Sequence, residues 1–511
     1  MTSSLLTILF SLFCSSVSPV KMGILEAKTG EERFNILYEA HVKALEKGAQ
    51  VDYSGIDTLR LEIPKKAKSI PLGNKTDFKG TVFIVNNVVP GNFFLFTKTQ
   101  NAEPVALKSL ADIDNGDFRG YSELRSGKKM LIIEDKNPWI ENRRGFNYGM
   151  NRRDILVLKN GKAQNKTCTV YDNEYTDASC SYVPMSKRET TFSDAEFYRT
   201  KTSTAKTFLV KFENENNIHI SNVKMVTPEG SGLYGDTEIF LKNCADVSID
   251  NIQIEGSYSI KDKYGYGISM DNVYHVVMDY VVGDAPWGVF GNNNVNYSVL
   301  KNSHVNRYDN HCYGKNFFFE NCMFDKYGFL YSSIYGDVMF EKCTFKYVFP
   351  CLNRIDFNAY SPFNIVFSDC KFFIDNSNYA LVNLLDIDEI QNPRNELFQK
   401  CLPNIVIKDC SFVINSNVKY LYIFYVGGYR YSKPLSYISS LTLKDINVSG
   451  ADVPLKISNT YITTENKIIS VFKNISYEGL QPNANYRFVN VSMLNKNEDS
   501  KLSIIGHNYI R

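Results

Sequence analysis

The stretch Asn296–Lys315 reads NYSVLKNSHVNRYDNHCYGK and contains KNSHV, one copy of a five-residue pattern that recurs along the chain. Close copies are ENCMF, EKCTF, SDCKF and KDCSF, and looser copies are SNVKM, DNIQI, MDYVV and KDINV. The central residues of the copies form one column: Val223, Ile252, Tyr280, Ser303, Cys322, Cys343, Cys370, Cys410 and Ile446. These residues are mostly small or apolar, so we expect the column to face a core.

The spacing between copies is irregular, for example 21 residues from Cys322 to Cys343 and 27 from there to Cys370. Loops of varied length must therefore interrupt a fixed strand. Repeats of this period with alternating apolar and polar positions are typical of a β-solenoid, in which each coil covers the apolar edge of the one before it. The alternative is a β-sandwich with chance similarity, which has no reason to keep one column in register through so many strands.

Two regions differ from the regular coils predicted over residues 208–448. Thr29–Gly48 predicts a helix that caps the open end of the solenoid, because Thr29 and Glu32 form a capping box and Ile36, Leu37, Ala40, Ala44 and Leu45 form an apolar stripe. Residues 100–200 are rich in charged and amide side chains, which predicts long loop excursions. We expect residues 21–511 to form a single parallel β-helix domain and a monomer.

The first 20 residues resemble a secretory signal peptide, since Leu5–Phe13 is apolar but too short to span a bilayer. Cys14 loosely resembles a lipoprotein box, so a lipid anchor is the alternative to cleavage. We expect a protein that is secreted, periplasmic or on the cell surface, with no other membrane association. The formal net charge of +2 gives no general attraction to nucleic acid, so a polyanionic partner would have to meet a local cationic patch.

The cysteines suggest packing more than cross-linking. Four of the eleven occupy the repeat column and are expected to be reduced core residues. Cys168 and Cys180 flank a loop and are the one candidate disulfide. No CxxC or HxxxH spacing occurs, so we expect no bound metal.

A second set of strands precedes the column strands: EIFL, GISM, GVFG, HCYG, SIYG and RIDF, which begin at Glu238, Gly267, Gly288, His311, Ser333 and Arg354. Their second residues, such as Ile239, Val289 and Cys312, are predicted to point inward, so the flanking residues should point to solvent. Since neighbouring coils lie about 4.8 Å apart, one exposed patch is expected to contain His311, Tyr313, Tyr335, Arg354 and Asp356, bordered by Arg307, Asp309 and Lys315.

This patch contains the groups that β-elimination from a uronic-acid polysaccharide requires. A cation, Arg307 or Arg354, would stabilise the charge on the sugar carboxylate. His311 has an ordinary pKa near 6.5, which suits proton abstraction, and Tyr313 or Tyr335 suits the role of acid or base. Hydrolysis would instead need two carboxylates, and Asp309 with Asp356 is the nearby pair.

Further residues are candidates for substrate binding. Trp287 and Tyr266 fit sugar-stacking positions, and Arg143 and Arg144, in the basic stretch ENRRGFNYGMNRRD, could hold anionic substituents. For each of these residues an ordinary structural role is the alternative, because exposed aromatics can stack on one another and charged stretches can form a solvated face.

The helix-capped start, the coils of N-x-x-F-x-[DN]-C-x-F type and the segment RYDNHCYGK resemble right-handed parallel β-helix proteins of the pectate lyase-like superfamily over residues 30–480. Within it the chain is most similar to bacterial glycosaminoglycan lyases acting on chondroitin, dermatan or hyaluronan. The resemblance implies a polysaccharide lyase acting on an anionic polysaccharide. Pectate lyases of this fold hold calcium in an acidic cluster; no comparable run of aspartates occurs here, so no cofactor is expected. A glycoside hydrolase and a non-catalytic glycan-binding adhesin are the alternatives.

Overall fold

The computed structural model divides the protein into two compact units. Unit 1 comprises Met1–Asn101, Met185–Ser269 and Tyr280–Val289, and unit 2 comprises Ala102–Pro184, Met270–Asp279 and Phe290–Arg511. The structure describes residues 16–64, 66, 68–86, 93–98, 101–140, 150–167, 175–185, 188–199, 208–226, 236–255, 265–285, 287–332, 334–346, 349–353, 364–375, 378–384, 403–418, 420–426, 438–451, 455–458, 461–464, 467–470, 472–478 and 501–504. Most of the predicted leader and Cys14 therefore lie outside the described residues.

Unit 1 begins with the predicted capping helix, α2 (Gly30–Lys47). The capping box is present, since the Thr29 side chain accepts from the Glu32 backbone N–H and the Glu32 carboxylate accepts from the Thr29 backbone N–H. The buried face differs slightly from the predicted stripe: it consists of Phe34, Leu37, Ala40, His41 and Ala44, whereas Leu45 is 44% exposed. The helix is preceded by the short elements β1 (Ser16–Val17) and η1 (Val20–Met22), and it contacts β2 (Gln50–Val51) and the first coil strands.

The coils of unit 1 are built from parallel strands that stack in two ladders. One ladder contains β3 (Thr58–Glu62), β5 (Lys75–Asn86), β12 (Thr190–Arg199), β14 (Asn216–Val226) and the second half of β15 (Asp236–Glu255). The other contains β4 (Ile70–Pro71), β6 (Phe93–Lys98), β13 (Phe208–Glu213) and the first half of β15. Strand β16 (Gly265–Gly283) follows. Unit 1 is thus a parallel β-helix segment under its capping helix.

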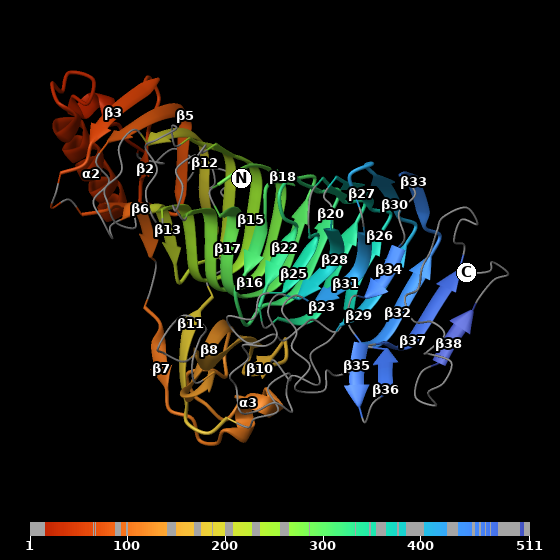
Figure 1. Ribbon diagram of the computed structural model, residues 1–511. Coiled ribbons are helices and arrows are strands. Elements are labelled where there is room, and N and C mark those ends of the chain that lie inside the picture. Colours follow the sequence, from red (N-terminus) through yellow and green to blue (C-terminus); the bar gives the residue numbers. More distant parts are fainter. Residues whose placement is uncertain are drawn as a thin grey trace, which may run out of the picture. The chain divides into compact units, whose positions relative to one another are not determined.

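Unit 2 has the same kind of architecture, with short parallel strands stacked in three ladders (Figure 1). The first ladder contains β17 (Gly288–Lys301), β19 (Tyr308–Asn310), β22 (Phe329–Tyr331), β25 (Cys351–Asn353), β28 (Asn378–Leu384), β31 (Tyr420–Val426) and β34 (Leu455–Ser458). The second contains β17 again, then β20 (Lys315–Glu320), β23 (Tyr335–Glu341), β26 (Asn364–Ser368), β29 (Asn404–Lys408), β32 (Ile438–Lys444), β37 (Phe472–Glu478) and β38 (Lys501–Ile504). The third contains β18 (His304–Val305), β21 (Met323–Phe324), β24 (Thr344–Phe345), β27 (Lys371–Ile374), β30 (Ser411–Ile414) and β33 (Asn447–Gly450). The strands β35 (Tyr461–Thr464) and β36 (Lys467–Ser470) form an antiparallel pair.

The repeat column lies in the core, as predicted, with one exception. The four cysteines Cys322, Cys343, Cys370 and Cys410 are buried free thiols, each no more than 2% exposed. Tyr280 is 57% exposed, and the buried residue of its coil is Val281. The prediction for Tyr280 was therefore wrong by one position.

The error arises because the residue before each core position has a left-handed backbone. In the nine coils of the repeat column this corner residue has φ between 46° and 56°: Asn222, Asn251, Tyr280, Asn302, Asn321, Lys342, Asp369, Asp409 and Asp445. A left-handed residue turns the chain sharply between two strands, and Asn and Asp adopt this conformation more readily than other side chains do. Tyr280 occupies this corner, so it belongs to the exposed column and not to the core column.

Aromatic side chains stack from coil to coil inside unit 2. Phe319, Phe340 and Phe367 form one row, with successive ring centroids 4.8 and 4.9 Å apart and nearly parallel ring planes. Phe324, Phe345, Phe372 and Phe412 form a second row at 5.3, 5.2 and 4.7 Å. Edge-to-face contacts join the rows, so the rings fill the space between two of the ladders.

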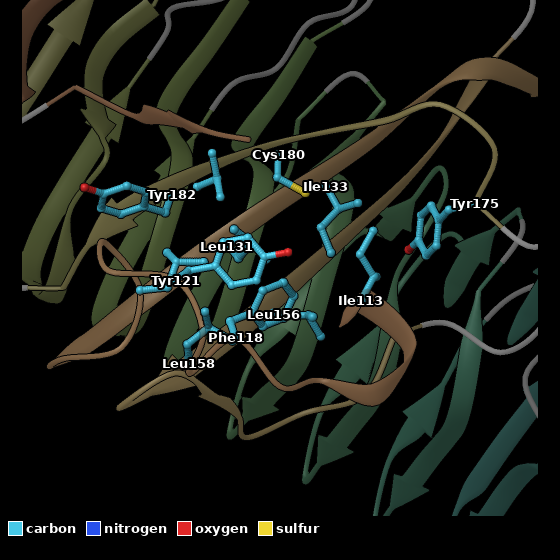
Figure 2. Close-up of a cluster of buried hydrophobic side chains, with 12 residues drawn as sticks. Ile113, Phe118, Tyr121, Leu131, Ile133, Leu156, Leu158, Tyr175, Cys180 and Tyr182 are labelled. Atoms are coloured by element: carbon cyan, nitrogen blue, oxygen red, sulfur yellow. The ribbon is translucent and has the colours of Figure 1, made fainter. Parts of the chain in front are cut away.

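An antiparallel sheet occupies much of the region in which loop excursions were expected. It consists of β7 (Glu103–Val105), β8 (Lys128–Ile140), β9 (Met150–Lys159), β10 (Lys162–Ala163) and β11 (Ala178–Pro184), with the short helix α3 (Ala111–Asn115). Twelve buried side chains form its own core, and Figure 2 shows Phe118, Tyr121 and Leu131 grouped within it. Cys180 belongs to this core as a free thiol, so it forms no disulfide; its predicted partner Cys168 lies outside the described residues.

Candidate functional site

The candidate site is built on β19 and the turn that follows it, residues 311–314. Alternation along β19 places Tyr308 inward, where its hydroxyl lies 2.8 Å from the Ser298 hydroxyl. The next side chain, Asp309, lies on the opposite side of the strand, in register with Gly291 and Leu330 of the neighbouring coils. The strand is thus fixed by an aromatic anchor on one side and presents a carboxylate on the other.

Arg307, Asp309 and His311 are two residues apart and lie together. The Arg307 Nε donates to Asp309 Oδ1 at 2.5 Å, and its Nη2 donates to the second carboxylate oxygen. The His311 Nε2 lies 3.9 Å from Asp309 Oδ2. Side-chain exposure rises from 1% at Asp309 to 12% at Arg307 and 21% at His311. The carboxylate is therefore buried beneath its two partners, and the imidazole is the most accessible group of the three.

The solvent exposure predicted for Tyr313 is wrong. Tyr313 is 3% exposed, and its hydroxyl donates to the backbone carbonyl of Asn151 on β9. Its backbone is left-handed, with φ of 61°, so the residue belongs to a corner and not to a strand. The antiparallel sheet β7–β11, called the inserted sheet below, lies against it through β9. Burial raises the pKa of the Tyr313 phenol well above its ordinary value, with a further contribution from Cys312. Tyr313 is therefore a neutral hydrogen-bond donor that fixes the inserted sheet.

Lys315 and Tyr335 form a separate contact after the turn. They are paired in register, and the Lys315 Nζ lies 4.8 Å from the centroid of the Tyr335 ring. The same Nζ donates to the carbonyl of Lys166 in the inserted region at 3.3 Å. The sequence alignment had placed Tyr335 opposite Tyr313, two residues from its true partner. Lys315 thus joins the coil, an aromatic ring and the inserted region.

The register of the preceding coil was also predicted incorrectly. GVFG was set against HCYG, which placed Phe290 opposite Tyr313, but Phe290 pairs with Tyr308. Phe290 is fully buried, and its ring centroid lies 4.7 Å from that of Tyr308. Phe290 therefore belongs to the core and not to an exposed surface, whereas the inward positions of Val289 and Cys312 are confirmed.

Strand β9 of the inserted sheet carries two arginines, Arg152 and Arg153, that are not among the predicted site residues. Arg152 is buried, lies 3.4 Å from the Asp154 carboxylate and stacks on the Tyr175 ring at 3.6 Å, so it is structural. Arg153 lies 3.4 Å from the Glu134 carboxylate and is electrostatically coupled to Asp271 and Tyr313. Burial opposes the charge of Arg153, but the carboxylates of Glu134 and Asp271 outweigh this effect and raise its pKa. The sequence signal was present in the basic stretch 141–154, which contains both arginines.

Four predicted site residues, Arg354, Asp356, Arg143 and Arg144, lie outside the described residues. Trp287 and Tyr266 belong to unit 1, where their rings contact each other edge to face with centroids 5.6 Å apart. The backbone N–H of Trp287 donates to the Gly265 carbonyl at 3.2 Å. These two aromatics form a packed pair at a turn.

Within the part of the chain that the structure describes, no group of three or more His, Cys, Asp or Glu side chains could hold a metal ion. No helix in the described segments is long and apolar enough to cross a membrane.

Comparison with known proteins identifies the fold. No family model and no curated protein matches this sequence. The tailspike protein gp49 from Pseudomonas phage LKA1 matches with a TM-score of 0.58 and 13% identity, over 92% of this chain and 83% of that chain. The tailspike gp61 of Pseudomonas phage phi297 matches with a TM-score of 0.56 and 8% identity, over 91% and 80%. The chain is an all-β, right-handed parallel β-helix with an N-terminal capping helix, as its sequence predicted.

Proposed function

We propose that the protein is a polysaccharide lyase that cleaves a uronic-acid-containing glycosaminoglycan by β-elimination, with His311 as the proton acceptor. The observation that carries the proposal is the Arg307–Asp309–His311 arrangement. A partly exposed imidazole lies beside a buried carboxylate, and the carboxylate is held in place by a bidentate arginine. Such a carboxylate stabilises the imidazolium that forms when the ring takes a proton.

This geometry changes the role expected of Arg307. Because its guanidinium is bonded to Asp309 on two sides, Arg307 acts as a positioning residue and not as the cation that meets the sugar carboxylate. Arg153 interacts electrostatically with Tyr313, and Lys315 follows Tyr313 by two residues, so we assign the sugar carboxylate to these two cations. A fixed cation there would stabilise the enolate-like charge that develops when the C5 proton leaves.

Hydrolysis by Asp309 and Asp356 is less well supported. A catalytic carboxyl group must reach the glycosidic bond, whereas Asp309 is 1% exposed and both of its oxygens accept hydrogen bonds from Arg307. The second carboxylate, Asp356, lies outside the described residues.

The test is incubation with chondroitin sulfate and with hyaluronan, followed by absorbance at about 232 nm, where the unsaturated uronate product of elimination absorbs. We expect His311→Gln to lower the initial rate by about 100-fold or more, because a glutamine cannot accept the proton. His304→Gln is the matched control, since His304 also contacts an aspartate, Asp325, but lies on β18 and not in the turn that contains His311. The control should retain the wild-type rate.

Three outcomes would contradict the proposal. His311→Gln with wild-type activity would remove the imidazole from the reaction. New reducing ends without the absorbance would indicate hydrolysis. Retention of the glycan with neither signal would indicate a binding protein, the adhesin alternative.

A further inference from the structure

Unit 1 contains a groove with a volume of about 510 Å³ along β5, β12, β14 and β15. This volume is within the usual range of about 300–1,000 Å³ for small-molecule sites. Eight charged or amide side chains contribute to its lining: Asp77, Lys79, Asp194, Glu196, Asn222, Lys224, Asn251 and Gln253. The groove therefore offers hydrogen-bonding groups on several sides.

One side of the groove is a rigid row of corner residues. Asp194, Asn222 and Asn251 have left-handed backbones, with φ of 60°, 53° and 51°. The Asn222 Nδ2 donates to Asp194 Oδ1 at 2.9 Å, and the Asn251 Nδ2 donates to Asn222 Oδ1 at 2.8 Å. The row uses one N–H of each amide, and a primary amide has two, so a second donor remains on each asparagine for a ligand. The row is ordered before any ligand binds, which lowers the entropic cost of binding.

The adjacent side is a row of side chains in register. Glu196 pairs with Lys224, and Lys224 pairs with Gln253, so these three side chains follow one another along the groove at the strand spacing of about 4.8 Å. Glu196 is held by the Tyr198 hydroxyl at 3.0 Å. At the end of the groove, a Cβ added to Gly80 would meet no atom within 4 Å, so the space there is open.

The charges in the groove are paired or acidic. Lys79 is bonded to Asp77, and Lys224 lies 3.2 Å from Glu255. Burial opposes ionisation of Asp77, but its hydrogen bonds to Lys79 outweigh this and lower its pKa, so the carboxylate is charged. No cationic surplus is available to attract a polyanion. Carboxylates and amides in fixed rows are instead suited to bidentate hydrogen bonds with the hydroxyls of a sugar.

We propose that this groove binds a segment of uncharged saccharide, at a site separate from the residues assigned to elimination. The proposal does not depend on the lyase activity, because it rests on other residues in the other unit. Its ligand class also differs, since the groove has paired or acidic charges and the elimination site has cationic residues.

The test measures binding of three uncharged probes, cellotetraose, maltotetraose and tetra-N-acetylchitotetraose, to the full-length protein by isothermal titration calorimetry. We expect at least one probe to bind with a Kd of about 1 mM or lower. Asn251→Gly and Glu196→Gln should each weaken that binding by about tenfold, because the first removes an amide from its row and the second replaces a carboxylate acceptor by an amide donor.

Asn321→Gly is the matched control for Asn251→Gly. Asn321 has φ of 52° and its Nδ2 donates to Asn302 Oδ1 at 2.8 Å, so it makes the same ladder contact in unit 2. Glycine tolerates this backbone conformation, so both variants should fold. The control should bind the probe as the wild type does.

The proposal would be overturned if no uncharged probe bound at millimolar concentration, or if Asn251→Gly and Glu196→Gln bound like the wild type. It would also be overturned if Asn321→Gly weakened binding equally, or if a chondroitin sulfate tetrasaccharide displaced the uncharged probe. Elimination rates at about 232 nm are expected to be unchanged in Asn251→Gly. The proposal for the groove and the proposal for the lyase site can therefore be refuted independently.

Discussion

Replacement of Arg307 by methionine should destabilise unit 2, because it removes both hydrogen bonds that Arg307 donates to a buried carboxylate. Asp309 is 1% exposed and Arg307 is 12% exposed, so solvent cannot replace the lost guanidinium. Breaking a buried ion pair by removing one partner costs about 3–5 kcal/mol. For a cooperative unit of about 300 residues, 1 kcal/mol shifts Tm by about 1.5 °C, so the expected fall is about 5–8 °C.

The double variant Arg307→Met/Asp309→Leu separates the charge from the packing. Asp309 is in register with Leu330, which is in turn in register with Leu352, and both leucines are 5% exposed. A leucine at position 309 would extend this apolar row, so the double variant should recover most of the lost stability. Elimination should remain impaired in it, because His311 has lost its carboxylate.

The assay is differential scanning calorimetry under reducing conditions, with Arg119→Met as the control. Arg119 makes the same kind of bidentate pair with Asp117 across one intervening residue, but 59% and 40% of the two side chains are exposed. Its loss should leave Tm unchanged. A Tm within about 1 °C of wild type for Arg307→Met, or a double variant as unstable as the single one, would refute the reasoning.

Three other predictions follow from buried groups, and a further one concerns metals. Burial lowers the pKa of His41 to about 3 from 6.5, so between these pH values the unfolded state binds a proton that the folded state does not. The free energy of unfolding should therefore be highest above pH 6.5 and about 2 kcal/mol lower at pH 5. His41→Gln should remove this pH dependence of Tm. Tyr313→Phe leaves the Asn151 carbonyl without its donor, so amide exchange along β9 should accelerate about fivefold, for a loss of about 1 kcal/mol, while β20 is unaffected. Burial raises the pKa of the Cys343 thiol well above its ordinary value, so mass spectrometry should find this residue unmodified by iodoacetamide in the native protein and modified after denaturation. EDTA should leave the elimination rate unchanged, and a rate restored only by added calcium would contradict this expectation.

The sequence was sufficient to predict the coils because their core positions follow simple steric rules. Cys322, Cys343, Cys370 and Cys410 are small residues, and a small or apolar residue at this place in a repeat indicates a side chain that the next coil covers. The helix was equally accessible, since Thr29 and Glu32 make a local capping signal. Both features depend on residues that lie close together in the sequence.

The site was harder to predict because it depends on contacts across long separations. Tyr313 is buried by Asn151 and its strand, 162 residues earlier in the chain. No local pattern reveals that an inserted sheet returns to cover this turn. The alignment of GVFG with HCYG failed for a different reason: β19 has only three residues, so HCYG falls in the turn after the strand and resembles a strand by composition alone.

The left-handed corners provide a way to recognise this architecture in sequences that share little identity. Each corner fixes one residue with positive φ directly before one inward residue, whatever the length of the loop that follows. An asparagine, aspartate or lysine followed by a small or apolar residue, repeated at irregular intervals, is therefore a signature of backbone geometry. Because it reports a dihedral angle and not ancestry, it can align coils between distant chains; among the nine corners named above, Tyr280 is the one that departs from it.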